Sequence, residues 1–400
     1  MIPSFTLSQK EQRILIMILG VIAGLGPFSV DMYLPGFPVI ANDLNASIGQ
    51  VSLTLTSYFI GISLGQLFYG PLVDRYGRKK PLLIGFAFYV IAAVGCAFAP
   101  TVEWLIGLRL MLALGSCVGI VASQSIVRDC FPNSEVARVF STLMLVMGVA
   151  PMIAPTLGGY VIAHFGWRYV FGSLACICLF MMFLIKRFVP ETKAFDSTIS
   201  LRFLPVLKSY RNTLRNKNFL IYGFAGSAVM GSLFAYIAGS PHVFMEIYGF
   251  SEKTYGWIFA LNAFGLILGS QVNRYLLKKY TTGFLIQRVS ILLVLCAIGL
   301  LLSLKIQIHE FQVLGLLFLY LFFSGFLYPN TNAMALSTFQ NNIGVASALL
   351  GSCRMFAGAA TSISIAVFHD GSINPMILTM SLCTLGACFM VKRPSINNNF

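Results

Sequence analysis

The sequence predicts an all-α membrane protein in which twelve transmembrane helices form two six-helix halves related by pseudo-symmetry. Three observations predict this fold: an apolar composition, twelve long apolar runs, and basic residues gathered on one side of those runs. Of the 400 residues, 57% are hydrophobic and 10% are charged, and the mean hydropathy is +0.82. Soluble domains carry about 25% charged residues. The composition therefore excludes a soluble enzyme, a nucleic-acid-binding module and a disordered chain, although the net charge is +14.

Twelve segments are long and apolar enough to cross a bilayer. A helix that crosses the hydrocarbon core needs roughly 20 apolar residues. The runs are continuously apolar rather than alternating, which indicates helices and not a β-barrel. We expect the spans at 13–37, 47–70, 81–99, 102–125, 137–162, 167–187, 218–241, 254–276, 284–305, 311–334, 344–368 and 373–392.

The lysines and arginines set the expected orientation. With the amino terminus inside, 22 of the 27 basic residues fall at inner ends or in inner loops, whereas Arg168, Lys253 and Lys305 fall outside. Cytoplasmic loops of membrane proteins are enriched in Lys and Arg. An even number of spans with this distribution predicts that both termini are cytoplasmic.

The longest polar stretch divides the chain. Residues 188–217 carry Pro190, Glu191 and many basic residues between the sixth and seventh runs. We expect an amino-terminal half at 1–187, a cytoplasmic linker at 188–217 and a carboxyl-terminal half at 218–400. The linker is expected either to contain an amphipathic helix on the membrane surface or to be a flexible tether.

An internal repeat supports two related halves. Residues 70–80 read GPLVDRYGRKK and residues 269–279 read GSQVNRYLLKK, so that Asp74 corresponds to Asn273. The Gly, Val, Arg, Tyr and both Lys coincide. Transporters built from repeated halves bind their substrate near the midplane between the halves. The repeat therefore predicts a transporter.

Residue types that form catalytic or metal sites are scattered along the sequence. The four histidines lie at the outer ends of runs without HxxH or HExxH spacing, and the nine cysteines form no CxxC pair. No nucleophile or phosphate-binding loop follows a plausible strand. We therefore expect no enzyme activity, no metal, no cofactor and no nucleic-acid partner.

The first loop of the repeat contains a recognisable motif. GPLVDRYGRKKPLL at 70–83 resembles the loop signature of the major facilitator superfamily between its second and third spans. The resemblance implies that superfamily's fold. It also implies that the loop acid helps to lock one conformation by pairing with neighbouring charges and a helix amino terminus. The residues that would take these roles are Gly70, Asp74, Arg75, Gly77, Arg78 and the nearby Asp129.

Two further spans match the same superfamily. RLMLALG at 109–115 retains the fourth-span arginine, Arg109, whereas Leu112 replaces the glutamine that often follows it. The fifth span reads GVAPMIAPTLGGY and resembles the antiporter signature of exporters. Its small residues and prolines share a helical face, which would equally suit ordinary close packing of helices. The signature residues are Gly148, Pro151, Pro155, Gly158 and Gly159.

Shorter matches narrow the resemblance. SVDMYLPGFP at 29–38, VRDCF at 127–131, FGWRYVF at 165–171 and PETK at 190–193 are similar to the bicyclomycin- and chloramphenicol-resistance (Bcr/CflA) drug:proton antiporters. The resemblance implies a multidrug efflux protein in the lipid bilayer of the bacterial inner membrane. It further implies a monomer whose partners are small lipophilic substrates and protons.

Three ionisable side chains lie inside the predicted spans, where they are costly and therefore candidates for function. Asp31 is in the first span, Arg109 in the fourth and Arg354 in the eleventh. A buried carboxyl that is balanced between desolvation and a nearby arginine can load a proton from one side and release it to the other. We expect Asp31 to be the proton-coupling acid and Arg109 its charge partner. The alternative is that Asp31 merely packs the end of its span.

Polar and aromatic residues inside the spans are candidates for substrate contact. A multidrug site needs aromatic walls and few fixed polar contacts. Arg354 is expected either to bind an anionic or acceptor-rich substrate or to pair with the carboxyl end of a helix. The candidates are Tyr33, Tyr58, Gln124, Tyr236, Asn262, Tyr328, Asn330, Asn332 and Arg354.

Together these features predict proton-coupled efflux of lipophilic small molecules or drugs across the inner membrane, by alternating access of the two halves. The alternative is proton-coupled uptake or export of a metabolite or siderophore. The fifth-span signature favours export.

Overall fold

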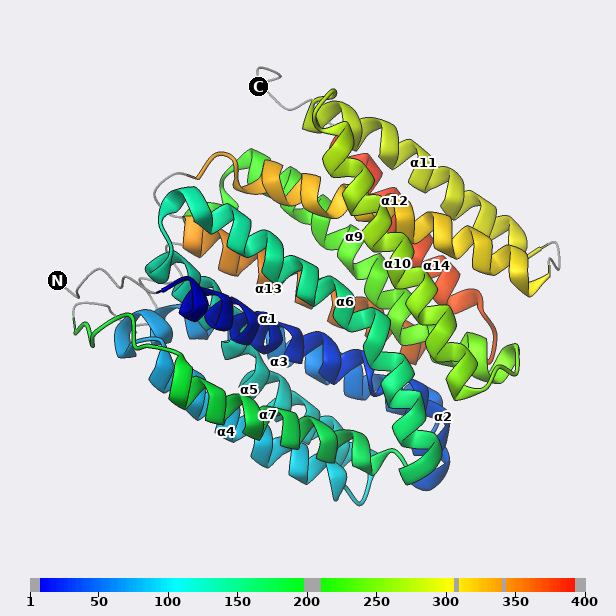
Figure 1. Ribbon diagram of the computed structural model, residues 1–400. Helices are drawn as coiled ribbons and strands as arrows, with labels where there is room; N and C mark the ends of the chain where they lie inside the picture. The colour runs from blue at the N-terminus through cyan, green and yellow to red at the C-terminus, as the bar shows by residue number, and fades with distance from the viewer. Residues whose placement is uncertain (1–7, 198–209, 306–308, 340–342, 393–400) are drawn as a thin grey trace.

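Long helices account for nearly all of the computed structural model, which describes residues 8–197, 210–305, 309–339 and 343–392 (Figure 1). The long helices are α1 (Gln9–Asp31), α3 (Ile48–Tyr76), α4 (Lys79–Ala97), α5 (Val102–Cys130), α6 (Asn133–Phe165), α7 (Arg168–Phe188), α9 (Lys217–Pro241), α10 (Glu252–Leu276), α11 (Thr282–Ser303), α12 (Glu310–Leu336), α13 (Ile343–Val367) and α14 (Asn374–Lys392). Shorter elements are the 3-10 helix η1 (Leu34–Gly36), α2 (Phe37–Asp43) and the π-helical segment η2 (His242–Ile247).

The predicted fold class is confirmed. Twelve helices in the described part of the chain are long and apolar enough to span a membrane, and each overlaps one predicted span. Several helices are longer than the apolar runs that predicted them; α6, for example, covers Asn133–Phe165 against a predicted 137–162. The headgroup regions on either side of the hydrocarbon core accept polar side chains, so a helix continues beyond its apolar run.

The first span differs from the prediction. A single run was expected at 13–37, but α1 ends at Asp31, and the chain continues through η1 and α2 to Asp43. Pro35 and Pro38 occupy the first turns of η1 and α2. Proline has no backbone N–H to donate and is tolerated at such starts, so these residues suit a broken helix. The break places Asp31 at the end of a helix.

Side-chain caps explain where several helices begin. Ser8, Ser47, Asn216, Ser251 and Thr281 each precede a helix and accept a hydrogen bond from the backbone N–H three residues later. A cap of this kind satisfies one of the N–H groups that a helix start leaves unpaired. The local sequence therefore determines where these helices begin.

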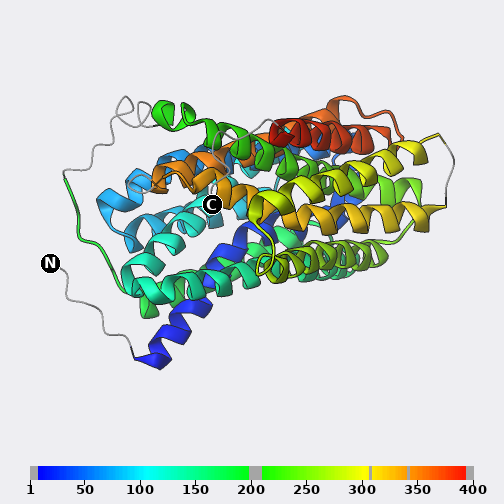
Figure 2. The same ribbon diagram turned by 90° about the horizontal axis from the view of Figure 1, so that it is seen from above.

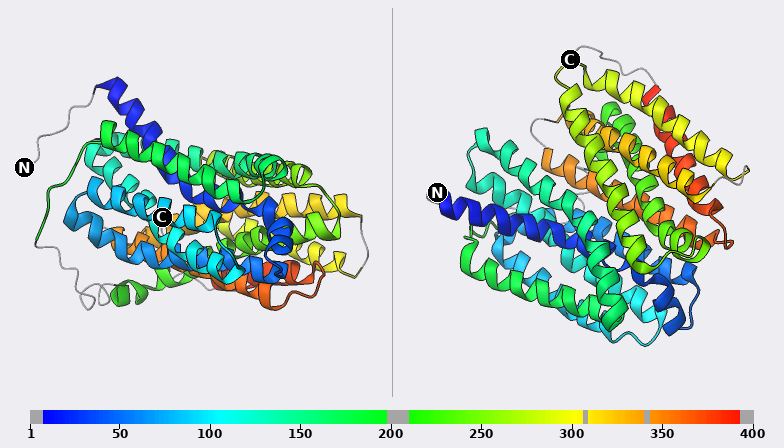
Figure 3. Two further views of the ribbon diagram at one scale, coloured as in Figure 1. Left: turned by 90° about the horizontal axis from the view of Figure 1, so that it is seen from below. Right: turned by 45° about the vertical axis from the view of Figure 1, so that its right-hand side comes forward.

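The long helices pack in two groups. One group comprises α1 to α7 and the other α9 to α14. In Figure 1, α1 to α5 and α7 lie in the lower part and α9 to α12 in the upper part, with α6 and α13 between them. The start of α1 projects beyond its neighbours (Figure 2 and Figure 3). Two helix pairs make most of the contacts between the groups: α3 with α13, and α6 with α10. These pairs form the seam between the groups.

Small and hydroxyl side chains line the α3–α13 part of the seam. The hydroxyl of Thr56 donates to Ser362 Oγ over 2.9 Å, and Ser63 Oγ donates to the carbonyl oxygen of Ser352 over 3.0 Å. The ring of Phe59 in α3 also packs against the ring of Phe234 in α9, with the two centroids 4.2 Å apart. Small and hydroxyl residues allow transmembrane helices to approach closely and to hydrogen-bond across the interface.

The α10–α12 contact is also close and yields a test of the packing. Gly325 of α12 lies directly against the backbone carbonyl of Leu266 in α10. Alanine at this position would force the helices apart, so we expect Gly325→Ala to lower the free energy of unfolding by about 1–3 kcal/mol. Gly315→Ala, in the same helix but facing open space, is the control. Thermal unfolding in detergent measures both, and equal midpoints for the two variants would contradict the packing described.

Candidate functional site

Arg109 of α5 is completely buried within the first group of helices. Its Nη1 donates a hydrogen bond to the carbonyl oxygen of Ser29 over 2.7 Å. The guanidinium carbon lies 4.6 Å from the ring centroids of both Tyr33 and Tyr58. Aromatic faces stabilise a cation, more so where water is excluded. Phe171, which the sequence analysis did not single out, adds a third ring at 5.8 Å.

Hydrogen bonds hold the two tyrosines of this cage in place. The Tyr33 hydroxyl pairs with Thr54 Oγ1 at 3.0 Å, and the Tyr58 hydroxyl pairs with Ser116 Oγ at 3.1 Å. Both tyrosines are almost fully buried. Two predicted substrate contacts are thus brought together with Arg109, and in this conformation they serve as its cage.

Asp31 lies at the carboxyl end of α1 and is 3% exposed. Its carboxylate has no hydrogen bond or ion pair with any residue in the described ranges. The expected charge pair with Arg109 is not formed in this conformation. Because α1 ends at Asp31, the carbonyl of Ser29 lacks its helical partner, and Arg109 binds that carbonyl instead. The spacing of residues along the sequence could not reveal that the Ser29 carbonyl, and not Asp31, accepts the hydrogen bond of Arg109.

Asp31 lies at the seam, because η1, which begins three residues after it, contacts both α9 and α10 of the second group. Tyr236 of α9 and Tyr255 of α10, both buried, belong to these two helices. Asn262 donates to the Tyr236 hydroxyl over 2.9 Å, and Ser240 pairs with the Tyr255 hydroxyl at 3.0 Å. Tyr236 and Asn262 were predicted site residues; Tyr255 and Ser240 were missed, because nothing in their local sequence distinguishes them from packing residues.

The fifth-span signature packs against both sides of this region. Gly158 of α6 lies directly against the backbone carbonyl of Met32, just after the end of α1. A Cβ at Gly159 would lie 3.0 Å from the carbonyl oxygen of Glu252 in α10. Gly148 also faces α10. These glycines allow α6 to touch the α1 break on one side and the other group of helices on the other.

The two prolines of the signature lie inside α6. Each removes a backbone hydrogen bond and favours a bend. Pro155 lies beside Gly256 of α10, where a Cβ would come within 3.3 Å of the Pro155 carbonyl carbon. Pro151 is half-buried.

Arg78 organises the loop motif between α3 and α4. Its Nη1 donates to Asp74 Oδ1 over 2.6 Å and its Nε donates to Asp129 Oδ2 over 2.8 Å. Thr192 also donates to Asp129, over 2.7 Å. Burial acts against the charged form of Arg78, but the hydrogen bonds to Asp129 and Asp74 outweigh it, so its pKa is raised above the usual value. The two predicted acids therefore share one buried arginine.

Glu191 caps the start of α4, a role that the sequence analysis missed. Its carboxylate accepts hydrogen bonds from the backbone N–H of Arg78 over 2.6 Å and of Lys79 over 3.1 Å. Gly77 adopts a φ of +87°, which favours glycine, and a Cβ there would lie 2.7 Å from the carbonyl of Lys193. The PETK segment after α7 could have signalled this contact, since it matched the subfamily.

The other motif residues have looser surroundings. The guanidinium of Arg75 lies 5.7 Å from the ring of Tyr76 and 5.8 Å from that of Phe195. Gly70 is half-buried on α3, and nothing lies within 4 Å of the position a Cβ would take. In the second repeat, Asn273 exchanges two hydrogen bonds with Asn330, at 3.1 and 2.8 Å. An amide pair thus stands where the first repeat has an acid, and it ties Asn330 to packing.

Arg354 of α13 is 6% exposed. Its guanidinium carbon lies 4.6 Å from the ring centroid of Tyr328, and Nη1 donates to the Tyr328 hydroxyl over 3.4 Å. Its Nε and Nη2 are buried without a hydrogen-bond partner. Gln124 and Asn332, the remaining candidates, are half-buried on α5 and α12.

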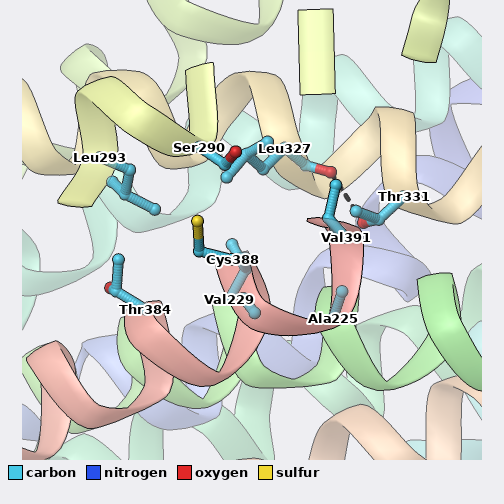
Figure 4. A pocket seen from close by; sticks show the side chains of 10 residues that line it. Ala225, Val229, Ser290, Leu293, Leu327, Thr331, Thr384, Cys388 and Val391 are labelled. Atoms are coloured by element: carbon cyan, nitrogen blue, oxygen red, sulfur yellow. Dashed lines mark hydrogen bonds between the residues drawn. The ribbon is translucent and has the colours of Figure 1, made fainter. Parts of the chain in front are cut away.

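A small crevice lies within the second group of helices (Figure 4). It has room for about one water molecule. Thr331 of α12 lines it, together with residues of α9, α11 and α14. None of the predicted substrate contacts lines this crevice, and we assign it no cargo.

Two histidines meet at the end of the bundle opposite the loop motif. The rings of His242 and His369 are 4.4 Å apart, and His242 Nδ1 bonds to Glu246 at 2.7 Å. The pair was not predicted from the sequence, because the two residues are far apart along the chain. Within the described ranges, no three metal-binding side chains gather into a cluster.

Twelve spanning helices in two groups, with an acid and two arginines buried among them, define a polytopic membrane transporter. A model of the Major Facilitator Superfamily matches residues 19–362. The chain therefore belongs to the Major Facilitator Superfamily, whose members are transporters rather than enzymes.

The similar proteins agree with this assignment. The chain is 31% identical to a bicyclomycin resistance protein homolog of Haemophilus influenzae, over 94% of this chain and 95% of that one. It is also 31% identical to a chloramphenicol resistance protein of Pseudomonas aeruginosa, over 64% and 60% of the two chains. A D-xylose-proton symporter has the same fold, with a TM-score of 0.75 at 16% identity over 94% and 97% of the chains. The predicted resemblance to drug:proton antiporters is confirmed, and the chain is a multi-pass protein of the bacterial inner membrane.

Removing Arg78 should leave two carboxylates facing each other. We expect Arg78→Gln to lower the free energy of unfolding by about 2 kcal/mol, because charged hydrogen bonds are lost and both acids are only partly screened by water. The double variant Arg78→Gln/Asp129→Asn should recover part of this loss. Denaturant titration of the purified proteins measures the cycle. Purely additive effects of the two changes would show that the pair does not interact.

Proposed function

We propose that this protein exports lipophilic small molecules across the inner membrane in exchange for protons, by alternating access. The cargo class is supported by the two relatives that are named for resistance to bicyclomycin and chloramphenicol. Export rather than uptake is supported by the fifth-span signature and its contacts with both groups of helices.

The observation that carries the proposal is the environment of Asp31. It is a buried acid without a hydrogen-bond or ion-pair partner in the described ranges, and it lies at the seam where the groups of helices meet. A charge buried without a partner is costly. A carboxyl in this setting has no fixed counter-ion, so its protonation changes with the access of water and cargo to the seam.

Proton exchange would then follow the rocking of the two groups. Arg109 holds the end of α1 through the Ser29 carbonyl, so Asp31 stays fixed relative to the first group. Tyr236 and Tyr255 belong to the second group and move away from Asp31 when the seam opens. Entry of cargo favours loss of the proton, and reprotonation favours release of cargo. Coupling therefore requires only one acid whose surroundings differ between the two states.

The proposed mechanism also assigns the domains of the chain and its orientation in the membrane. Residues 1–187 and 218–400 form the two rocking halves, and 188–217 links them on the cytoplasmic side. The loop motif and both termini face the cytoplasm, as the distribution of basic residues favours. The protein acts as a monomer, since one chain supplies both halves.

The alternative is proton-coupled uptake, or export of a metabolite or siderophore, by the same halves. Inside-out vesicles separate antiport from symport. In vesicles with an acidic lumen, an antiporter accumulates drug inside, whereas a symporter does not.

Asp31→Asn tests the coupling role. We expect this variant to reduce drug resistance to the level of pump-deficient cells without the protein, because asparagine cannot carry a proton. Resistance and the amount of protein in the membrane are measured together. Glu103→Gln, which removes an exposed acid at the start of α5, is the matched control and should retain resistance. Proton-driven efflux by Asp31→Asn at the rate of the unaltered protein would reject the assignment.

A further inference from the structure

Arg354 is a buried cation that forms no ion pair with any residue in the described ranges. The carboxyl-terminal half, residues 218–400, contains four Asp or Glu residues. None of them lies in the two long stretches 253–309 and 311–369, the second of which contains Arg354. All four lie at helix ends or in loops opposite the loop motif, and they are Glu246, Glu252, Glu310 and Asp370. A buried charge without a counter-ion is expensive, and the cost falls when an anion binds it.

The unpartnered atoms of Arg354 form one edge of its guanidinium. Nε and Nη2 project their N–H groups in parallel, and both are buried without a hydrogen-bond partner. This edge is the fork that binds the two oxygens of a carboxylate. Because these nitrogen atoms are themselves removed from water, the side chain does not extend its charge to the membrane surface.

The neighbours enclose the free edge in this conformation and place an aromatic ring beside it. Gly226 of α9 lies opposite, where even a Cβ would come within 3.5 Å of Nη2 and 2.7 Å of Thr331 Oγ1. Tyr328 covers the face of the guanidinium with its ring. The surroundings therefore combine a single anion-binding fork with an aromatic surface.

We propose that Arg354, with Tyr328 beside it, forms a subsite for the carboxylate or similar acidic group of an amphiphilic cargo with an aromatic or apolar body. The inference rests on the proposed function, because it identifies the ligand as cargo. Tyr328 contacts the cargo body, and the fork is exposed to cargo only when the helices around it separate during alternating access. A permanent lipid contact does not fit, since Arg354 of α13 faces Gly226 of α9 and Tyr328 of α12 with 6% of its surface exposed.

The test compares three probes that share one ring system: 2-naphthylacetate, its neutral amide, and the cationic 2-naphthylethylamine. Calorimetry measures their binding to the full-length protein in lipid nanodiscs without any proton gradient. The unaltered protein is expected to bind the carboxylate at least tenfold more tightly than the amide, and the amine least tightly. Equal affinities for the carboxylate and the amide would overturn the proposal without any variant being needed.

Variants locate the preference. Arg354→Gln should weaken carboxylate binding about tenfold, to the level of the amide, and leave amide binding unchanged. Arg354→Lys keeps the charge but not the fork and should give an intermediate value. Arg288→Gln, which removes an exposed arginine from α11, should bind like the unaltered protein. Unchanged carboxylate binding by Arg354→Gln would overturn the proposal.

Two further outcomes separate this inference from the proposed function. If equimolar chloride displaced the carboxylate completely, the fork would be a site for any small anion and the cargo subsite would be rejected. If the carboxylate preference persisted in a protein that shows no proton-driven efflux, the proposed function would fall while the subsite stood. Proton-driven efflux without any carboxylate preference would reject the subsite and leave the proposed function standing.

Discussion

The end of α1 at Asp31 is the constraint on which the rest of the site depends. Because the helix stops there, the carbonyl of Ser29 is free to accept a hydrogen bond from Arg109. The chain that follows must also pass α6, and Gly158 makes room for the backbone of Met32. A buried arginine, a glycine of the fifth-span signature and an unpartnered acid are thus linked through one helix terminus.

The buried charges of this chain are handled in three different ways. Arg78 shares two acids and is held in the loop motif. Arg109 has no acid, but its Nη1 donates to a carbonyl and two aromatic rings stabilise its charge, while its Nε and Nη2 are buried without a hydrogen-bond partner. Arg354 has one aromatic face but two nitrogen atoms without a hydrogen-bond partner, and Asp31 has neither arrangement. Groups that are fully compensated hold a structure in place, whereas uncompensated groups can bind protons or ligands that come and go.

Much of the fold could be predicted from the sequence because hydropathy records directly which segments lie in lipid. The loop motif was also readable, since Asp74, Arg78 and Asp129 do meet. The surroundings of Asp31 and Arg109 could not be predicted in the same way, because spacing along a helix does not reveal where that helix ends. The same limit hid the arginine cage, because Tyr33 was predicted as a substrate contact and its place beside Arg109 was not foreseen. Glu191 was missed because its partners are backbone N–H groups, and the PETK match by itself did not place the segment beside α4.

The most direct test of coupling through Asp31 is the number of protons displaced when cargo binds. Purified protein in weakly buffered detergent solution is mixed with a neutral drug that it exports, and a pH-indicator dye reports the protons released. Coupling through Asp31 predicts proton release by the unaltered protein and none by the Asp31→Asn variant at equal drug occupancy. Binding by the unaltered protein without proton release, or equal release by both proteins, would contradict it.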